Sequence, residues 1–414
     1  RLYVVTNNAN MLCFDAKSGA KKWEYSLGRV MKGSPVVTAD GVIYAGEVNG
    51  RFLILRDVGD RCEPLDIDEF PKRGDAGVEI NGSPAVVNGR VYFANTYEIY
   101  CLGKTEAAAQ TAFIPPMVSA AQADASTPAY VRVIPAEATI APGERINFSV
   151  ALFDANGQKI GSSEAQWSSA GVGGAFDGPG TFLAGSDRTF SAGKITATVD
   201  SLTADALLRV SPNLPIHENF DAMTIDSRPP GWIGVALKTK IVEREGEIVF
   251  KKEALRPSAK YGRMRSYSGP PLPAGYTVEA DLLGEPKKGR RPALSDMGLI
   301  NARYKMILLG YEKAIRLVTY SPIPRLQVEV PFEWEANTWY RAKFSFEVVG
   351  GKGYARGKVW QRNEQEPADW MIEMIDPCPN LEGSPGLYAY SKGTTGRKPG
   401  APVYFDNYRV YRSD

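Results

Sequence analysis

The residues best suited to hold a ligand lie on one face of a hairpin near the C-terminal end of the chain. Residues 339–349 and 354–362 alternate between apolar and polar side chains, as two β-strands do, and glycine-rich residues 350–353 separate them. Antiparallel pairing through a four-residue loop places Phe346 opposite Gly357 on a core face. The opposite face then carries these aromatic and charged side chains: Trp339, Arg341, Lys343, Glu347, Arg356, Lys358 and Trp360.

Two interpretations of this face remain open. Tryptophan rings stack on sugars, and arginine, lysine and glutamate bond to hydroxyl groups, so the face could be a glycan-binding surface. The alternative is a solvated outer face with one cation–π pair, since large side chains are often exposed without a ligand.

A second group of residues with possible chemistry is a run of carboxylates. Glu279, Asp281 and Glu285 follow one another in a segment that resembles the E-x-D-x-(x)-E strand of concanavalin-like glucanases. In that family, alternate carboxylates act as nucleophile and acid/base. Here the last glutamate lies one or two residues too far along, beyond Gly284. The segment therefore favours a related strand in a domain without hydrolytic activity.

Few residues of the sequence could bind a metal ion or form a catalytic triad. Asp221 and Asp406 could meet if the strands that carry them pair, and their oxygens would suit calcium, but ordinary turn and edge carboxylates are the simpler interpretation. His217 is the single histidine, which argues against a zinc cluster and a Ser-His-Asp triad. The four cysteines are Cys13, Cys62, Cys101 and Cys378; they form no C-x-x-C pair, and they permit one or two disulfides without requiring them.

The elements that must position these residues form a unit from 213 to 414. Its beginning, Glu218 to Asp221, and its end, Val403 to Tyr411 with the letters FDN, resemble the concanavalin-like or laminin-G-like jelly roll. That resemblance implies a two-sheet sandwich in which the first and last strands pair.

A repeat occupies residues 1–104. The run GSPVV at 33–37, followed by GVIY, recurs as GSPAV at 82–86, followed by GRVY. A spacing of about 40 to 50 residues with several strands per copy is typical of a propeller blade. Cys13 to Trp23 resembles the tryptophan-docking motif of PQQ-type β-propellers, with Cys13 in place of the usual alanine. The resemblance implies that Asp15, Gly19 and Trp23 hold blades together, and Cys13 and Cys101, at equivalent positions, are expected to be buried apolar residues rather than a disulfide.

The docking motif describes a scaffold and not an active site. Quinoprotein dehydrogenases share it, but their adjacent cysteine pair and calcium-binding carboxylates have no counterpart here. About three blades also cannot close a ring. We therefore expect no cofactor in this fragment, a structural calcium at most, and no PQQ.

Two further segments separate these units. Residues 105–128 are rich in Ala, Gln, Ser and Pro without periodicity, which predicts a linker. Residues 129–212 contain about seven short alternating stretches and resemble the bacterial Ig-like family, with Trp167 as the core tryptophan. The predicted fold class is thus all-β: propeller blades, an Ig-like sandwich and a jelly roll.

The composition argues against two classes of partner, nucleic acids and membranes. Lys and Arg number 49 against 47 Asp and Glu, so there is no basic stripe for nucleic acid, and no apolar run is long enough to span a membrane. The chain opens on the strand-like sequence RLYVV, which we interpret as the interior of a longer protein whose export signal lies upstream. The expected location is periplasmic or extracellular.

The favoured function is an exported, non-catalytic binding or scaffold protein. Its propeller would be an interaction platform, and its jelly roll would bind a glycan, a cell surface or a protein partner. The alternatives are a glycan hydrolase in the C-terminal unit and a quinoprotein oxidoreductase whose active part lies upstream.

Overall fold

The computed structural model describes residues 1–6, 9–28, 30–71, 78–103, 127–253, 262–287, 294–319, 325–392 and 400–413. The elements of these residues are β-strands, which confirms the all-β prediction. The chain divides into two compact units, residues 1–120 and 121–414. The predicted linker lies almost entirely outside the described residues. In the part described, no helix is long and apolar enough to cross a membrane.

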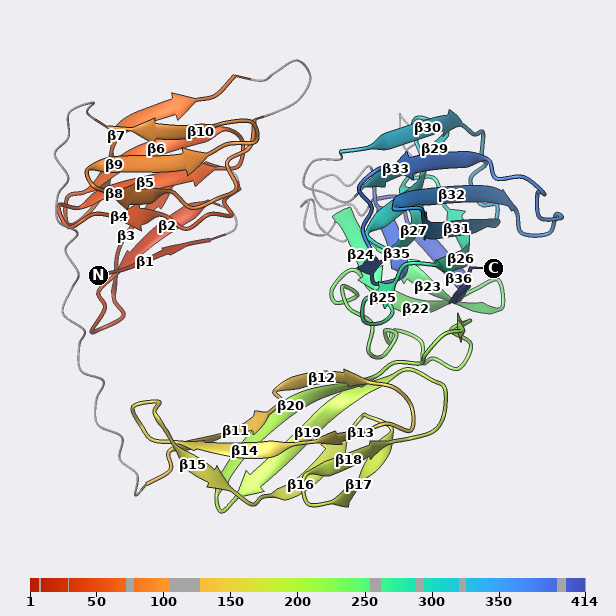
Figure 1. Cartoon of the computed structure of the whole chain (residues 1–414), viewed down its shortest axis with the longest axis horizontal. Helices are drawn as coiled ribbons and strands as arrows, with labels where there is room; N and C mark the ends of the chain where they lie inside the picture. Colours follow the sequence, from red (N-terminus) through yellow and green to blue (C-terminus); the bar gives the residue numbers. More distant parts are fainter. Residues whose placement is uncertain are drawn as a thin grey trace. The chain divides into compact units, whose positions relative to one another are not determined.

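The N-terminal unit consists of three antiparallel sheets (Figure 1). Their strands are β1 (Leu2–Val5), β2 (Asn10–Phe14) and β3 (Lys21–Ser26); β4 (Val36–Val37), β5 (Val42–Glu47), β6 (Arg51–Asp57) and β7 (Cys62–Glu69); and β8 (Ala85–Val87), β9 (Arg90–Ala94) and β10 (Ile99–Leu102). The two GSP repeats touch, because the backbone amide of Ser34 donates to Ser83 Oγ at 2.8 Å. Each of the three predicted copies of the repeat corresponds to one of these sheets.

Trp23 connects the first sheet to the second. It is 5 % exposed on β3, and its indole Nε1 donates to Asp57 Oδ1 at 3.1 Å on β6. Asp57 also accepts hydrogen bonds from Tyr3 Oη at 2.6 Å, from the Gly59 amide at 2.8 Å and from Arg1. Burial alone would raise the Asp57 pKa, but these donors hold it at about 2. Sequence reasoning missed Asp57, the residue on which the docking tryptophan and its neighbours converge.

The other docking residues shape the turn before Trp23. Asp15 Oδ1 accepts hydrogen bonds from the Lys17 amide at 3.1 Å and from the Ser18 amide and hydroxyl at 3.0 Å. Hydrogen bonds from Ser18 and Lys17 lower the Asp15 pKa to about 2. Gly19 has φ +72°, in the region that glycine adopts most easily. The turn thus returns the chain toward Trp23.

All four cysteines are free. Cys13 and Cys62 are buried, as predicted for Cys13, whereas Cys101 is exposed, and so is Cys378. The prediction for Cys101 is wrong because β10 is an edge strand of a three-stranded sheet.

Residues 130–210 form a sandwich of three small sheets, called here the middle sandwich. The sheets are β11 (Tyr130–Ile134), β14 (Ser149–Phe153) and β15 (Lys159–Ser163); β12 (Glu137–Ile140), β20 (Leu202–Val210), β19 (Ser191–Val199) and β16 (Gln166–Ala170); and β13 (Arg145–Asn147), β18 (Thr181–Ala184) and β17 (Gly174–Gly178). Trp167 is half-buried against the core, between Phe148 and Phe176.

The C-terminal sandwich packs a large sheet against a smaller one. The eight-stranded sheet contains β22 (Thr239–Arg244), β23 (Glu247–Lys252), β36 (Val403–Arg412), β26 (Tyr276–Gly284), β31 (Tyr340–Val349), β32 (Lys352–Gln361) and β33 (Ile372–Asp376), with β21 (Ile216–Glu218) paired to β36. The six-stranded sheet contains β24 (Arg263–Tyr267), β35 (Gly386–Tyr390), β27 (Asp296–Asn301), β28 (Tyr304–Leu309), β29 (Ala314–Thr319) and β30 (Gln327–Pro331), and β25 (Leu272–Pro273) pairs with β34 (Glu382–Gly383). The first and last strands pair, as the jelly-roll resemblance implied.

The predicted hairpin forms, but with a different register. Phe346 lies opposite Ala355, and Val349 lies opposite Lys352, so the loop is only Gly350 and Gly351. Both glycines have positive φ, +57° and +77°, as the tightest hairpin turns require. The pairing that we predicted from a four-residue loop is therefore wrong by two residues. Because side chains alternate with a period of two, the predicted core and outer faces are nevertheless correct.

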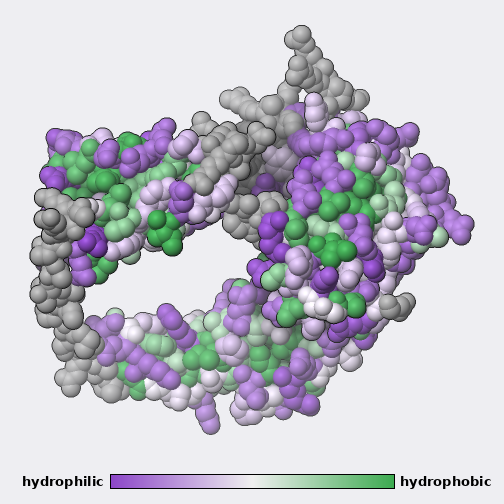
Figure 2. All heavy atoms as spheres, turned by 45° about the horizontal axis from the view of Figure 1, so that its top comes forward, coloured by the Kyte–Doolittle hydropathy of each residue, from purple (hydrophilic) through white to green (hydrophobic). Residues whose placement is uncertain are grey.

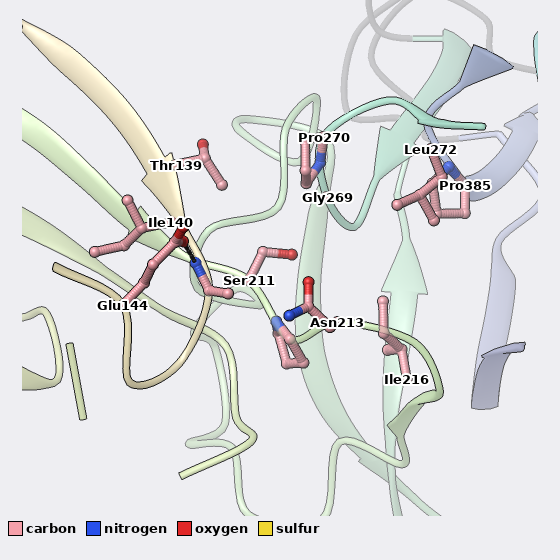
Figure 3. Close-up of a pocket in the computed structure, with 12 residues that line it drawn as sticks. Thr139, Ile140, Glu144, Ser211, Asn213, Ile216, Gly269, Pro270, Leu272 and Pro385 are labelled. Carbon is pink, nitrogen blue, oxygen red and sulfur yellow. Dashed lines mark hydrogen bonds between the residues drawn. The ribbon is translucent and has the colours of Figure 1, made fainter. Parts of the chain in front are cut away.

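The two sandwiches of residues 121–414 contact each other directly. Phe190 of the middle sandwich packs edge-on against Trp232 of the C-terminal sandwich, with ring centroids 5.9 Å apart. Arg188 Nη2 donates to the carbonyl oxygens of Asn213 at 2.8 Å and Pro215 at 3.1 Å. A cavity of about 170 Å³ lies at this junction (Figure 3), and Glu144, which borders it, accepts the Ala141 amide at 2.7 Å.

Candidate functional site

The predicted ligand-binding side chains share the outer face of the eight-stranded sheet, called here the carboxylate face. On β31 and β32 most of their charges are already paired. Glu366 lies 2.9 Å from Lys343 Nζ and 2.7 Å from Lys358 Nζ, and Lys358 also donates to the Pro367 carbonyl at 2.7 Å. The segment after β32 thus returns over the hairpin, and Lys358 and Trp360 are only 6 % and 7 % exposed.

The remaining predicted residues on the hairpin have local partners as well. Arg356 pairs with Glu373 at 2.6 Å, and Glu347 accepts from the Ser345 hydroxyl at 3.4 Å. Trp339 is half-buried, and the Arg362 guanidinium lies 5.0 Å from its ring centroid. A sugar on this part of the face would have to displace existing contacts.

The carboxylates of β26 lie on the same face, beside Arg341. Asp281 is fully buried, and Arg341 donates to both of its oxygens, at 2.7 Å from Nε and 3.1 Å from Nη2. Glu279 accepts from Tyr411 Oη at 3.1 Å and lies 3.7 Å from Arg341 Nε. The structure therefore brings together two predicted catalytic candidates and one predicted ligand-binding arginine.

Asp406, which we considered as a calcium ligand, lies opposite Asp281 in the sheet. The register between β26 and β36 shifts at this point, a bulge of the kind that re-aims side chains near functional sites. Asn407 Nδ2 lies 2.9 Å from Asp281 Oδ2 and 3.1 Å from Asp406 Oδ2, so these two oxygens are no more than 6.0 Å apart. Burial, with the nearby charges of Asp281, Glu247 and Asp221, raises the Asp406 pKa to about 7.

Of the other two acidic candidates, Glu285 lies apart from this pair, whereas Asp221 is close enough to Asp406 for its charge to help raise the Asp406 pKa. Glu285 is bonded to Arg244, and six residues of extended strand, about 20 Å, separate it from Glu279. Asp221 accepts a hydrogen bond from Asn219 at 2.5 Å. Among the residues described, no group of three His, Cys, Asp or Glu side chains forms a metal-binding cluster.

The outer face of the six-stranded sheet carries a second set of side chains, called here the tyrosine face. Tyr267, Tyr388 and Tyr390 lie there in a cluster with aliphatic residues of β27, β28 and β29. Four cations share the face: Arg263, Arg265, Lys305 and Arg316. The Arg263 guanidinium lies 5.7 Å from the Tyr390 ring centroid, and Lys305 Nζ lies 5.5 Å from that of Tyr388.

A cavity opens at one end of the tyrosine face. It has a volume of about 300 Å³, at the lower end of the range for ligand pockets. Tyr267 and Ile300 of the tyrosine face line it, together with Pro271, Arg303, Glu382, Gly383 and Ser384. On the face of the protein drawn in Figure 2, hydrophobic areas (green) lie among hydrophilic ones (purple).

Comparison with known proteins gives one sequence match. Residues 1–113 match the family model described as outer membrane protein assembly factor BamB. No curated protein matches the chain.

Solved structures give distant likenesses to the fold. A β-1,3-glucanase from Mycobacterium marinum is 14 % identical, with a TM-score of 0.34 over 49 % of this chain and 99 % of its own. The lectin UEA-II complexed with galactose is 10 % identical, with a TM-score of 0.30 over 47 % of this chain and 98 % of its own. A bifunctional GH43-CE protein of Bacteroides eggerthii is 13 % identical, with a TM-score of 0.30 over 98 % of this chain and 51 % of its own. Likenesses this distant assign no activity to the chain.

Sequence reasoning missed the tyrosine face, although part of its signal was visible. Arg263, Arg265 and Tyr267 alternate along one strand, and Tyr388 and Tyr390 along another. Each stretch alone resembles any half-buried strand. Only the pairing of β35 with β24 on one side and with β27 on the other gathers them on one surface.

Proposed function

We propose that the C-terminal sandwich is a non-catalytic, jelly-roll glycan-binding domain of an exported protein, and that its ligand lies on the tyrosine face. In this proposal residues 1–104 are propeller blades that serve as an interaction platform, and the middle sandwich is an Ig-like spacer. The observation that supports it best is the combination of three tyrosines, four cations and an adjoining cavity on one sheet surface.

Tyrosine suits this role because its ring stacks on the apolar face of a sugar while its hydroxyl remains available for hydrogen bonds. Tyr267 and Tyr390 are both half-exposed, so their rings are within reach of a ligand. Arginine at the edge of such a surface adds directional hydrogen bonds to sugar oxygens.

The carboxylate face is a weaker place for a glycan. Arg341, Lys343, Arg356 and Lys358 have carboxylate partners, and Asp281 has both oxygens engaged by Arg341 and Asn407. A carboxylate engaged in that way is a weaker nucleophile, because hydrogen bonds from charged and amide donors stabilise the negative charge of its oxygens. Leu282, Leu283 and Gly284 separate Asp281 from Glu285, which supports a domain that binds without hydrolysis.

A matched pair of variants tests where the ligand binds. Tyr390→Leu changes the tyrosine face, and Tyr354→Leu changes a half-exposed tyrosine of the carboxylate face that also has an arginine, Arg356, 5.3 Å from its ring centroid. On a glycan array probed with the whole chain, we expect binding that Tyr390→Leu weakens and Tyr354→Leu leaves unchanged. Absence of binding to any glycan, or loss only in Tyr354→Leu, would contradict the proposal.

Hydrolysis remains a second candidate because of one observation. Asp406, whose pKa is raised to about 7, lies beside the Arg341-bound Asp281, and a carboxyl group with a raised pKa next to a second carboxyl group is the arrangement of a general acid and its partner. If this pair is catalytic, the protein releases reducing ends from a polysaccharide, and Asp406→Asn abolishes that release. No release from a broad polysaccharide panel would exclude the pair.

A further inference from the structure

The cations of the tyrosine face come from β24, β28 and β29, and the buried Lys305 of β28 lies at the centre of the group. Across the sheet, the register runs Arg265 to Tyr388, Tyr388 to Gly298, Gly298 to Ile307 and Ile307 to Arg316. Strands lie about 4.8 Å apart, so this row is roughly 19 Å long. Lys305 lies in the adjacent row, directly opposite Ile300 of the cavity wall.

Lys305 shows that this centre is electropositive. It is 7 % exposed, and burial lowers its pKa to about 8, assisted by the positive charges of Arg265, Arg263 and Arg316. A negative group arriving here would favour the charged form of the lysine.

The acids of the same face lie at its margins and have cations of their own. Asp296 lies 2.9 Å from Lys392 Nζ and accepts the Gly310 amide at 2.9 Å. Glu329, on edge strand β30, pairs with Arg316 at 2.8 Å. Glu329 thus neutralises Arg316, one of the four cations, and Lys392 neutralises Asp296, so the positive field around Lys305 comes mainly from Arg263 and Arg265.

We infer that the ligand of the tyrosine face is an acidic oligosaccharide, whose carboxylate or sulfate group lies near Lys305, Arg263 and Arg265 while its sugar rings contact the tyrosines. This inference rests on the proposed function and names the class of glycan. A charge-assisted hydrogen bond is roughly twice as strong as a neutral one, so the charged group dominates selectivity.

A nucleic acid fits this surface less well than an acidic sugar does. Backbone phosphates repeat along a polymer and are usually met by exposed lysines and arginines, with strong dependence on salt. Here the central lysine is buried among aliphatic side chains, and the chain as a whole carries a formal charge of only +2. One anionic group on a compact sugar matches one buried cationic centre.

Two matched ligand pairs test the charge requirement with the whole chain. Oligogalacturonate hexamer is compared with its methyl ester, and dextran sulfate with dextran, by titration calorimetry at pH 7. We expect at least one acidic member to bind about ten-fold or more tightly than its neutral partner. Binding should weaken above pH 8, where Lys305 loses its proton in the free protein.

Three variants locate the effect. Lys305→Met removes the buried charge. Arg263→Gln changes an exposed residue, so it tests the same inference even if Lys305→Met fails to fold. Both should reduce the preference for the acidic ligand, whereas Lys352→Met, at the hairpin tip, should not.

Each outcome bears on a different statement. Equal binding of acidic and neutral partners overturns the inference and leaves the glycan-binding proposal standing. Absence of binding to these ligands and to every glycan on the array overturns the proposal itself. Tight binding of an oligo(dT) probe that depends on Lys305, without binding of either acidic glycan, assigns the face to nucleic acid and overturns the inference.

Discussion

Removal of the Arg341 side chain tests how the carboxylate face is held together. Asp281 is fully buried, and Arg341 supplies two of its hydrogen bonds. In Arg341→Met the Asp281 charge keeps only the amide of Asn407 and still lies beside Glu279 and Asp406. Loss of one partner of a buried pair costs about 3–5 kcal/mol, and because the Arg341 side chain is 25 % exposed we expect the lower end, about 3 kcal/mol.

Urea unfolding followed by tryptophan fluorescence measures this loss. A matched control is Arg356→Met on the adjacent strand, whose pair with Glu373 is exposed, so its cost should stay below about 1 kcal/mol. A second variant, Asp281→Asn combined with Arg341→Met, removes the stranded charge and should recover most of the stability. If Arg341→Met costs no more than Arg356→Met, or if the double variant recovers nothing, the ion pair does not stabilise the sheet as argued.

Three further changes test the remaining contacts. The Asp406 pKa of about 7 lies above that of an unfolded aspartate, so the folded state binds a proton that the unfolded state releases, and stability should decline as pH rises from about 4 to 7. Asp406→Asn should flatten that decline in thermal melts recorded at several pH values. An unchanged slope would contradict the assignment. Trp23→Phe removes the indole donor to the ionised Asp57 and should cost about 1.5–3 kcal/mol in urea unfolding of the N-terminal unit, unlike a conservative surface change. Gly351→Ala forces a side chain into φ +77° and should cost about 1 kcal/mol or more, whereas Gly161→Ala, with φ outside that region and open space around it, should cost little; equal effects would refute the turn argument.

The hairpin shows how far local sequence reasoning reaches. Alternation along residues 339–362 correctly predicts which side chains face the core, because the period of a strand is a local property. The register depends instead on the conformation of Gly350 and Gly351, and a four-residue loop and a two-residue loop fit the same letters. Sequence alone therefore leaves the cross-strand partners undetermined.

The carboxylate face shows the other limit. The acids of β26 and Asp406 were each visible, but as unrelated candidates for hydrolysis and for calcium binding. They form one cluster because β36 lies beside β26, a pairing in which Asp281 and Asp406 are 125 residues apart and which no local pattern encodes. The tyrosine face was missed for the same reason, since its tyrosines and cations come from four strands, β24, β28, β29 and β35, which span more than 120 residues of the chain.

The two-glycine turn also sets a rule for how this hairpin can lengthen. Adding an even number of residues at Gly350 and Gly351 moves the tip outward and keeps every existing side chain on its own side of the sheet. Adding an odd number within the paired region inverts one arm, which would push Phe344 and Phe346 into water and bring lysines into the core. Insertions at Gly350 and Gly351 should therefore be tolerated, whereas insertions within the paired strands should be tolerated according to parity more than according to size.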